Sequence, residues 1–221
     1  LLDTPNSRAV QSILKRLIDI SGALVGVMVL APVMLGTAVA IRLTSPGPVL
    51  FKQIRIGKDF HPFTFWKFRS MYVGADDTIH RSYLEKLIKG DTAGANQGSV
   101  DHVFYKIQSD GRVTPIGRFI RKTSIDELPQ LFNVLTGDMS LVGPRPPIPY
   151  ETQNYQPWHL RRILEVKPGL TGIWQVEGRS QTTFDEMVRM DLRYSRDWSV
   201  LLDLKLILRT FRVVVECKGA V

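Results

Sequence analysis

The longest hydrophobic run of the chain lies near its N-terminus. Residues 20–41 read ISGALVGVMVLAPVMLGTAVAI and carry no charge, and a helix of that length can cross a bilayer. Pro32 stands near the middle, where a proline removes a backbone hydrogen bond and kinks or breaks the helix. Basic residues flank both ends, whereas a simple span is usually basic on one side. The pattern favours a helix–break–helix that turns back, with a single span or a buried core helix as alternatives.

Three residues before this run fit the place where such a hairpin would enter a membrane. Lys15 and Asp19 are four apart, so on a helix they can pair, and Lys15 and Arg16 can meet lipid phosphates. Ordinary flanking side chains of a hydrophobic helix would give the same pattern. We expect Lys15, Arg16, Asp19 and Pro32 to be the residues that contact membrane lipid.

Strand-like alternation follows the hydrophobic run. Residues 44–48, TSPGP, form a turn cluster that ends the helix. Residues 49–57 and 60–71 then alternate hydrophobic and polar positions, which predicts two strands paired as a β-hairpin. Lys67 and Arg69 are two apart, so on a strand they share a face and can bind one anion together; a cationic solvent-facing edge is the alternative.

Helices are expected to predominate in the rest of the chain. Residues 76–89 predict a surface helix, and a small polar loop follows at 90–99. Residues 167–176 predict a turn followed by a strand, and residues 184–193 predict a further helix. The last hydrophobic segment, 198–215, is short for a span and carries charges throughout. This pattern favours an amphipathic helix at a membrane interface over a core-packing helix.

Two adjacent carboxylates stand at the start of another predicted helix. Ser124 and Glu127 match a capping box, and hydrophobic residues follow at helical spacing. Pro129 is tolerated only near a helix start, which places Asp126 and Glu127 in the first turn, where the helix dipole favours negative charge. Acidic residues are common in first turns. Position alone therefore does not distinguish a catalytic pair from ordinary helix capping.

Arginines in turns surround this pair in the sequence. Arg121 precedes it, and Arg145 stands between prolines in residues 143–147, GPRPP. The guanidinium is a planar fork that matches phosphate oxygens, and rigid flanks reduce the ordering that binding requires. Residues 178–180, GRS, form a second tight turn that carries Arg179. An exposed arginine in a plain linker is the alternative interpretation.

The overall charge narrows the classes of partner. The chain of 221 residues has a formal net charge of +8 and a pI of about 9.7, which favours nucleic acid, acidic lipid headgroups or phosphorylated substrates. We expect no nucleic acid, because the aromatic residues lie mostly at core-like spacing and form no stacking platform. The single cysteine, Cys217, excludes an intramolecular disulfide and a cysteine-rich zinc site.

Several longer motifs, in one order, resemble the bacterial sugar transferase family of monotopic polyprenyl-phosphate phosphoglycosyl transferases. The resemblance covers nearly the whole chain. The motifs are KRLID at 15–19, FWKFRSM at 65–71, SIDELPQLFNVL at 124–135, GDMSLVGPRP at 137–146, PGLTG at 168–172 and DLK at 203–205.

The resemblance implies a fold and a location. The fold class expected is α/β of the mixed α+β kind. A re-entrant membrane helix–break–helix with its flank occupies residues 1–47. A small, mostly helical catalytic domain with a short β-hairpin and amphipathic surface helices occupies residues 48–221. The implied location is the bacterial inner (cytoplasmic) membrane, with the monotopic protein exposing its catalytic domain on the cytoplasmic face.

The resemblance also implies a reaction. A polyprenyl phosphate such as undecaprenyl phosphate acquires a sugar-1-phosphate from a UDP-sugar, UMP is released and Mg2+ is required. By position, Asp126 corresponds to the nucleophile and Glu127 to the Mg2+ ligand beside it, so both are expected catalytic and metal-binding residues. A non-catalytic scaffold that binds anionic lipid is the alternative, but it has no use for two adjacent carboxylates. The expected substrate-binding residues are Lys67, Arg69, Arg121, Arg145, Arg179 and Asp203.

The chain departs from the family pattern in two places. Small members carry Ser-Pro at the helix break, where this chain has Ala31-Pro32, and we expect the break to persist through Pro32 alone. Residues 75–109 are longer than the minimal core and are expected to be a variable insertion that shapes sugar specificity or a subunit contact. Together with the hydrophobic C-terminal segment, this insertion suggests a homodimer. No residue identifies the sugar.

Overall fold

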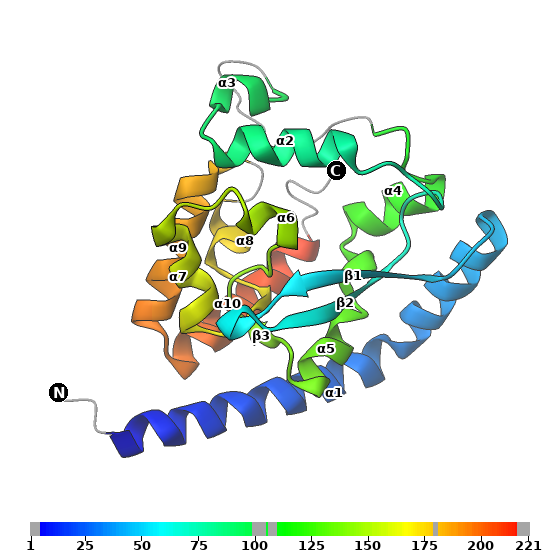
Figure 1. Ribbon diagram of the computed structural model, residues 1–221. Helices are drawn as coiled ribbons and strands as arrows, with labels where there is room; N and C mark the ends of the chain where they lie inside the picture. The colour runs from blue at the N-terminus through cyan, green and yellow to red at the C-terminus, as the bar shows by residue number, and fades with distance from the viewer. Residues whose placement is uncertain (1–4, 99–104, 106–109, 179–180, 216–221) are drawn as a thin grey trace.

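The computed structural model describes residues 5–98, 105, 110–178 and 181–215. A long N-terminal helix lies along one edge of a body built from shorter helices and two small sheets (Figure 1). The elements are α1 (Pro5–Thr44), β1 (Leu50–Ile56), η1 (Lys58–Phe60), β2 (Pro62–Phe68), α2 (Thr78–Ile88), α3 (Thr92–Ala95), α4 (Pro115–Lys122), η2 (Ile125–Glu127), α5 (Gln130–Thr136), β3 (Ser140–Val142), α6 (Pro149–Thr152), α7 (Pro157–Glu165), β4 (Gly169–Thr171), α8 (Ile173–Glu177), α9 (Phe184–Asp197) and α10 (Val200–Val215).

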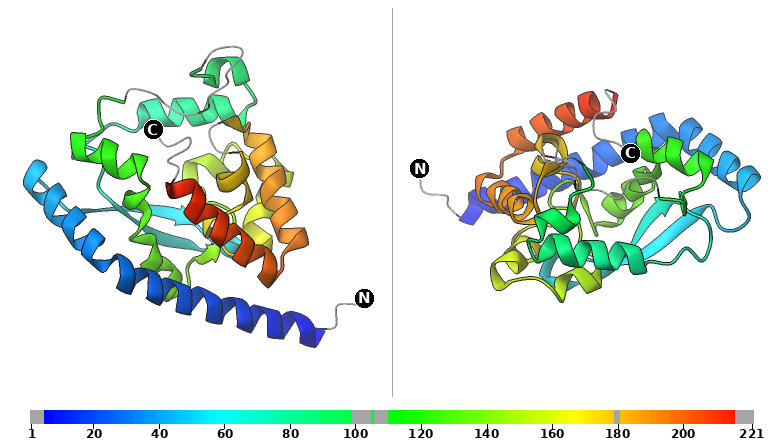
Figure 2. Two further views of the ribbon diagram at one scale, coloured as in Figure 1. Left: turned by 180° about the vertical axis from the view of Figure 1, so that it is seen from behind. Right: turned by 90° about the horizontal axis from the view of Figure 1, so that it is seen from above.

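The first helix is continuous where the sequence predicted a break. α1 runs from Pro5 to Thr44 with Pro32 inside it, and its axis bends rather than folding back on itself (Figures 1 and 2). The predicted interruption at Pro32 is therefore wrong as secondary structure. A proline removes one intrahelical hydrogen bond, and the remaining bonds are sufficient to carry a bent helix through that position. The prediction that the turn cluster at 44–48 ends the helix is confirmed, because α1 ends at Thr44.

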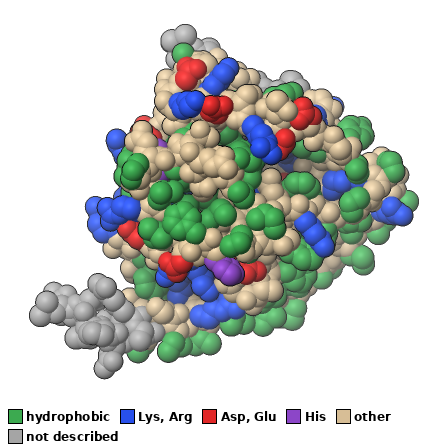
Figure 3. Space-filling view, in the orientation of Figure 1, with side chains coloured by type: hydrophobic (Ala, Val, Ile, Leu, Met, Phe, Trp, Pro, Cys, Tyr) green, Lys and Arg blue, Asp and Glu red, His purple; other side chains and the backbone are tan. Residues whose placement is uncertain are grey.

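Both halves of α1 pack on the same body. Ala23 is buried in a core cluster with Phe65, and Ile41 is buried in another with Phe68 and Ile120. The opposite face of the helix is hydrophobic and exposed, and hydrophobic side chains follow the lower edge of the molecule along the course of α1 (Figure 3). Exposed residues of this face include Val10, Ile13, Leu17, Leu24, Val25, Met28, Val29, Leu35, Val39 and Leu43.

This helix also meets the length and composition of a membrane segment. Val10–Thr44, which contains an 18-residue stretch with a mean hydropathy of 2.4, is the one such helix in the described part of the chain. Most of it is exposed rather than buried in the body. A core helix would be covered by protein on all sides, so the alternative of a buried core helix is wrong.

The predicted β-hairpin is confirmed, and the Asn133 side chain makes hydrogen bonds to backbone groups of its second strand. β1 and β2 pair antiparallel, with Lys52 opposite Trp66. Asn133, buried on α5, donates from Nδ2 to the Thr64 carbonyl oxygen at 2.7 Å and accepts from the Trp66 amide at 3.2 Å. The amide therefore satisfies backbone groups at the outer edge of β2 and fixes α5 beside the hairpin.

A second, parallel sheet joins distant parts of the chain. β3 and β4 pair Ser140 with Gly169 and Val142 with Thr171. The predicted strand at 167–176 is correct only for β4, because the chain turns at Gly172 and continues as helix α8. The tight turn brings backbone close to backbone, and a side chain at Gly172 would meet other protein atoms.

Two surface helices frame the body. α2 confirms the helix predicted at 76–89, and the short helix α3 lies within the loop predicted at 90–99. α2 packs on α9 through a cluster that contains Ile88, Phe184 and Val188. α10 buries Leu206 and Asp203 but exposes a hydrophobic stripe, so it combines the two predicted kinds of helix. The exposed stripe comprises Leu201, Leu204, Leu208 and Phe211.

Candidate active site

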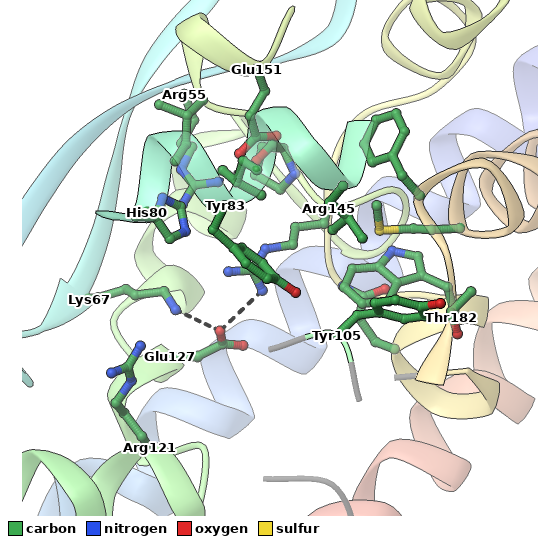
Figure 4. A pocket seen from close by; sticks show the side chains of 18 of the residues that line it. Arg55, Lys67, His80, Tyr83, Tyr105, Arg121, Glu127, Arg145, Glu151 and Thr182 are labelled. Carbon is green, nitrogen blue, oxygen red and sulfur yellow. Dashed lines mark hydrogen bonds and ion pairs between the residues drawn. The ribbon is translucent and has the colours of Figure 1, made fainter. Parts of the chain in front are cut away.

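A cavity of about 410 Å³ lies where the β-hairpin, the turn before α5 and helices α2, α8 and α9 meet. Basic side chains gather around Glu127 at one end of this cavity (Figure 4). The structure thus brings together five of the residues expected from the sequence to act on substrate or metal. They are Lys67, Arg121, Asp126, Glu127 and Arg145.

The two carboxylates lie in a tight turn rather than in the first turn of an α-helix. η2 spans Ile125–Glu127, and α5 begins only at Gln130. Ser124 has a left-handed φ of 58° and makes no side-chain cap hydrogen bond, so the predicted capping box is wrong. The physical reason is that Glu127 is drawn to a cationic partner, accepting a hydrogen bond from the Lys67 ammonium at 2.7 Å.

One ammonium group bridges the carboxylate pair. Lys67 Nζ lies 2.7 Å from Glu127 Oε1 and 3.5 Å from Asp126 Oδ2. Arg145 Nη1 approaches the same Glu127 oxygen at 3.5 Å. The Asp126 side chain is only 8% exposed, against 26% for Glu127. Oxygens from both carboxylates therefore converge on one position, which the Lys67 ammonium occupies.

Burial raises the pKa of Asp126. The buried carboxylate loses hydration, which disfavours its charged form. Three cationic neighbours lower the pKa of Asp126, first Lys67 and then Arg121 and Arg145, whereas the negative charge of Glu127 raises it further. The basic cluster offsets part of this rise and so acts toward the ionised form of Asp126, which is the form that can act as a nucleophile.

The Arg145 turn is held from behind by two buried arginines. Arg162 Nη2 donates to the Arg145 carbonyl oxygen at 2.9 Å and lies 2.7 Å from Asp191 Oδ2. Arg55 Nη1 donates to the Pro146 carbonyl oxygen at 2.8 Å. Consecutive carbonyl groups of the GPRPP turn are therefore fixed, which limits the positions that the Arg145 side chain can take.

Sequence reasoning missed Arg55, His80 and Arg162, which all line the cavity. Burial and repulsion from Arg145 lower the pKa of Arg55 to about 10. Burial and several arginines lower the pKa of His80 to about 4, so its imidazole is neutral at physiological pH; Nδ1 lies 2.7 Å from the Tyr150 hydroxyl. Of these three residues, only Arg55 could have been found from the pairing of the hairpin. Arg55 pairs with Phe63, and Phe63 and Lys67 are four apart on β2, so all three side chains lie on one face of the hairpin.

Arg69 does not accompany Lys67 into the cavity. It lies just past the end of β2, is buried, and donates from Nη2 to the Ser45 carbonyl oxygen at 2.8 Å and to the Ser45 hydroxyl at 2.7 Å. The expected joint anion site of Lys67 and Arg69 is not formed, and the alternative of a solvent-facing edge is also wrong for Arg69. Carbonyl groups at the end of α1 have no intrahelical donor, and Arg69 supplies one.

Asp203 also lies away from the cavity lining. It is buried on α10, where it accepts from the Lys15 ammonium at 2.6 Å and from the Tyr194 hydroxyl at 2.7 Å. The expected pair of Lys15 with Asp19 is therefore replaced by a pair with Asp203. Asp19 is buried instead and accepts from the Ser140 hydroxyl at 2.9 Å.

Of the two remaining residues that we expected to contact lipid, Arg16 contacts the body and Pro32 is exposed. Arg16 donates to the carbonyl oxygens of Val134 and Leu135 at 2.6 and 2.8 Å, where the end of α5 offers free acceptors. Lys15, Arg16 and Asp19 thus anchor α1 to the body, and Pro32 is exposed on α1. Arg179 lies outside the described residues.

The carboxylate pair fits a divalent cation that is shared with substrate. No group of three or more His, Cys, Asp or Glu side chains able to hold a metal is found in the described ranges. Mg2+, however, is commonly held by one or two carboxylates together with substrate phosphates and water. Asp126 and Glu127 supply such oxygens, and the ammonium of Lys67 already stands where these oxygens converge.

Comparisons with known proteins match nearly the whole chain. A profile of the family described as bacterial sugar transferase matches residues 10–217. The chain is 45% identical over 209 residues to the galactosyl transferase CpsE of Streptococcus agalactiae, covering 94% of this chain and 43% of the relative. It is 41% identical over 222 residues to the UDP-glucose:undecaprenyl-phosphate glucose-1-phosphate transferase of Escherichia coli, covering 95% and 42%.

A shorter relative is covered almost completely. The exopolysaccharide production protein ExoY of Sinorhizobium fredii is 33% identical over 218 residues, which cover 99% of this chain and 92% of the relative. The chain therefore spans less than half the length of CpsE and of the glucose-1-phosphate transferase, but nearly all of ExoY.

Proposed function

Because the chain belongs to the bacterial sugar transferase family, we propose that it transfers a sugar-1-phosphate from a UDP-sugar to undecaprenyl phosphate and releases UMP. The observation that carries this proposal is the pair of Asp126 and Glu127 facing a cavity lined by arginines. Relatives are named as undecaprenyl-phosphate transferases of glucose or of galactose, which supports this class of substrate. A role in exopolysaccharide assembly is the corresponding pathway proposal, supported by the name of ExoY.

The reaction proceeds in two displacements at one phosphorus. A carboxylate oxygen of Asp126 attacks the phosphorus that bears the sugar. The bond between this phosphorus and the oxygen that bridges the two phosphates breaks, and UMP leaves with that oxygen. An oxygen of undecaprenyl phosphate then attacks the same phosphorus, and Asp126 leaves as a carboxylate. The product is undecaprenyl diphosphate carrying the sugar.

The cationic side chains oppose the repulsion between Asp126 and the diphosphate. Arg145 presents a planar fork suited to phosphate oxygens, and Lys67 and Arg121 add positive charge around Asp126. When bound by Asp126 and Glu127, Mg2+ would neutralise charge on the diphosphate and on the departing UMP. With Glu127 engaged in this way, the Lys67 ammonium would be available to bind a phosphate oxygen.

We propose that the body lies on the cytoplasmic face of the bacterial inner membrane and that α1 is re-entrant. The support is that residues near both ends of α1 contact one body, Lys15 bonding Asp203 and Ser45 bonding Arg69. A straight span would carry one end to the opposite side of the bilayer. The exposed hydrophobic faces of α1 and α10 would lie in one leaflet, and undecaprenyl phosphate would reach the cavity from there.

Labelling of introduced cysteines tests this topology. In a Cys217→Ser background, Ser12→Cys and Thr44→Cys place thiols at exposed polar positions near the two ends of α1. Both react with a membrane-impermeant maleimide from the same side of sealed vesicles if α1 is re-entrant. Labelling of the two thiols from opposite sides would establish a span instead.

Release of UMP from a panel of UDP-sugars, with undecaprenyl phosphate and Mg2+, tests the reaction. We expect Asp126→Asn to lower the rate by about 10⁴-fold or more, as for other nucleophiles, and mass spectrometry to find a phosphosugar adduct on Asp126 of the native protein. Glu165→Gln, at an exposed ion pair, is the matched control and keeps the native rate. Turnover by Asp126→Asn near the native rate would refute the covalent mechanism, and absence of UMP release with every UDP-sugar would favour a lipid-binding scaffold.

The division at residue 47 and the homodimer stay predictions. The insertion at 75–109 contributes α2 to a wall of the cavity, which supports a role for it in substrate specificity. Size-exclusion chromatography with light scattering in native-like lipid checks the oligomeric state, and a monomer only would contradict the homodimer.

A further inference from the structure

The cavity has a second, aromatic end that the proposed chemistry does not use. Tyr83 on α2, Trp174 on α8 and Phe184 on α9 line it, with aliphatic neighbours. In Figure 4 Tyr83 lies beside Arg145, while Tyr105 and Thr182 lie on the far side of the cavity from Lys67 and Arg121. The aliphatic lining residues are Leu84, Leu87 and Met187.

Two polar atoms in this end are buried without a hydrogen-bond partner among the described residues. They are the hydroxyl oxygen of Tyr83 and Nε1 of Trp174. Buried polar groups in native proteins are nearly always paired, so two such atoms in one cavity indicate groups that a ligand or water completes. Burial raises the pKa of Tyr83 to about 12, so its hydroxyl keeps its proton at neutral pH.

Both atoms belong to well-supported elements. Tyr83 lies on α2, which is packed on α9 through Ile88 and Phe184. Trp174 lies in the first turn of α8, which begins at Ile173 after β4 has ended at Thr171. The phenol and the indole are therefore carried by two helices, α2 and α8, that each pack on α9.

We propose that this aromatic end binds the uracil ring of the UDP-sugar, an inference that rests on the proposed function. Uracil is flat and can stack on aromatic and aliphatic walls. Its edge carries two carbonyl acceptors beside an N–H donor. The Trp174 indole can only donate and so suits a carbonyl, while the Tyr83 hydroxyl can donate to a carbonyl or accept from the N–H.

The order of groups along the cavity agrees with the order of groups in the substrate. In a UDP-sugar, a phosphate and a ribose separate the base from the phosphorus that Asp126 would attack. In Figure 4 the Arg145 side chain lies beside both Glu127 and Tyr83, so a phosphate bound by Arg145 would lie next to the aromatic end. A hexose carries several hydroxyl groups and suits the polar wall of Arg55, His80 and Glu151 better than a largely apolar end.

Calorimetric binding of UMP and of ribose 5-phosphate to the full chain tests the inference, because the two probes differ only in the base. We expect Trp174→Phe and Tyr83→Phe, which keep the rings and remove the polar atoms, each to weaken UMP about three- to tenfold. Neither variant should change the affinity for ribose 5-phosphate. Trp66→Phe, on β2 and outside the cavity lining, is the matched control and should change neither affinity.

Two results would overturn the inference. One is an equal loss of affinity for UMP and ribose 5-phosphate in both variants. The other is unchanged UMP binding with a raised KM for the UDP-sugar, which would assign this end to the sugar. Binding needs no turnover, so base-dependent UMP binding without UMP release would refute the proposed reaction and leave the uracil site standing. UMP release with no preference for UMP over ribose 5-phosphate would do the reverse.

Discussion

Replacing Asp191 with asparagine removes the charge opposite a buried arginine. The side chains of Arg162 and Asp191 are 3% and 1% exposed and approach to 2.7 Å. A neutral amide leaves the guanidinium uncompensated in the interior, and breaking a buried pair from one side costs about 3–5 kcal/mol. Because domains are stable by only about 5–15 kcal/mol, we expect Asp191→Asn to lose a large share of the free energy of unfolding.

Thermal unfolding in mild detergent measures this loss. A destabilisation of that size lowers Tm by about 6–20 °C in a chain of this length. Glu165→Gln breaks the exposed pair with Arg161 and should lower the free energy of unfolding by less than about 1 kcal/mol. The double variant Arg162→Met/Asp191→Leu removes both charges and should recover most of the stability, because a hydrophobic replacement of a buried pair is commonly neutral or stabilising.

The double variant also separates stability from activity. It lacks the donor to the Arg145 carbonyl oxygen, so we expect UMP release to fall several-fold although the protein is folded. If Asp191→Asn melts at the same temperature as Glu165→Gln, the argument from burial is wrong. A double variant with the full rate of UMP release would show that Arg162 does not position Arg145.

Three further predictions follow from single side chains. The pKa of His80 is about 4 in the folded chain, against an ordinary value of 6.5. Between pH 6.5 and pH 4 the unfolded chain therefore binds a proton that the folded chain does not, and the free energy of unfolding falls by roughly 3 kcal/mol over this range. Urea titrations at several pH values should show that His80→Gln reduces this acid sensitivity. Gly143→Ala would overlap the Lys167 carbonyl oxygen and should cost about 1–3 kcal/mol in thermal unfolding, whereas Gly36→Ala, with open space around it, should not destabilise. Met28→Arg puts a charge on the exposed hydrophobic face of α1 and should shift protein from the membrane to the soluble fraction in sedimentation, and an unchanged distribution would contradict a buried position in lipid.

The sequence by itself determined the elements whose signal is local. The uncharged run at 20–41, the alternation around the hairpin and the spacing at 76–89 each identified the right kind of element, because side-chain periodicity follows directly from helix and strand geometry. The motifs around Asp126 and Arg145 also identified the family, and both side chains line the cavity.

Tertiary structure decided where the polar side chains go. Arg69 and Asp203 carry the same charges as the cavity residues, yet Arg69 serves the end of α1 and Asp203 holds Lys15. Ser124 adopts a left-handed conformation because Glu127 bonds to Lys67, which lies sixty positions earlier in the chain. No local pattern of residues indicates this partner. A charged or polar group takes the partner that compensates its burial, and which partners are within reach is known only when distant segments pack together.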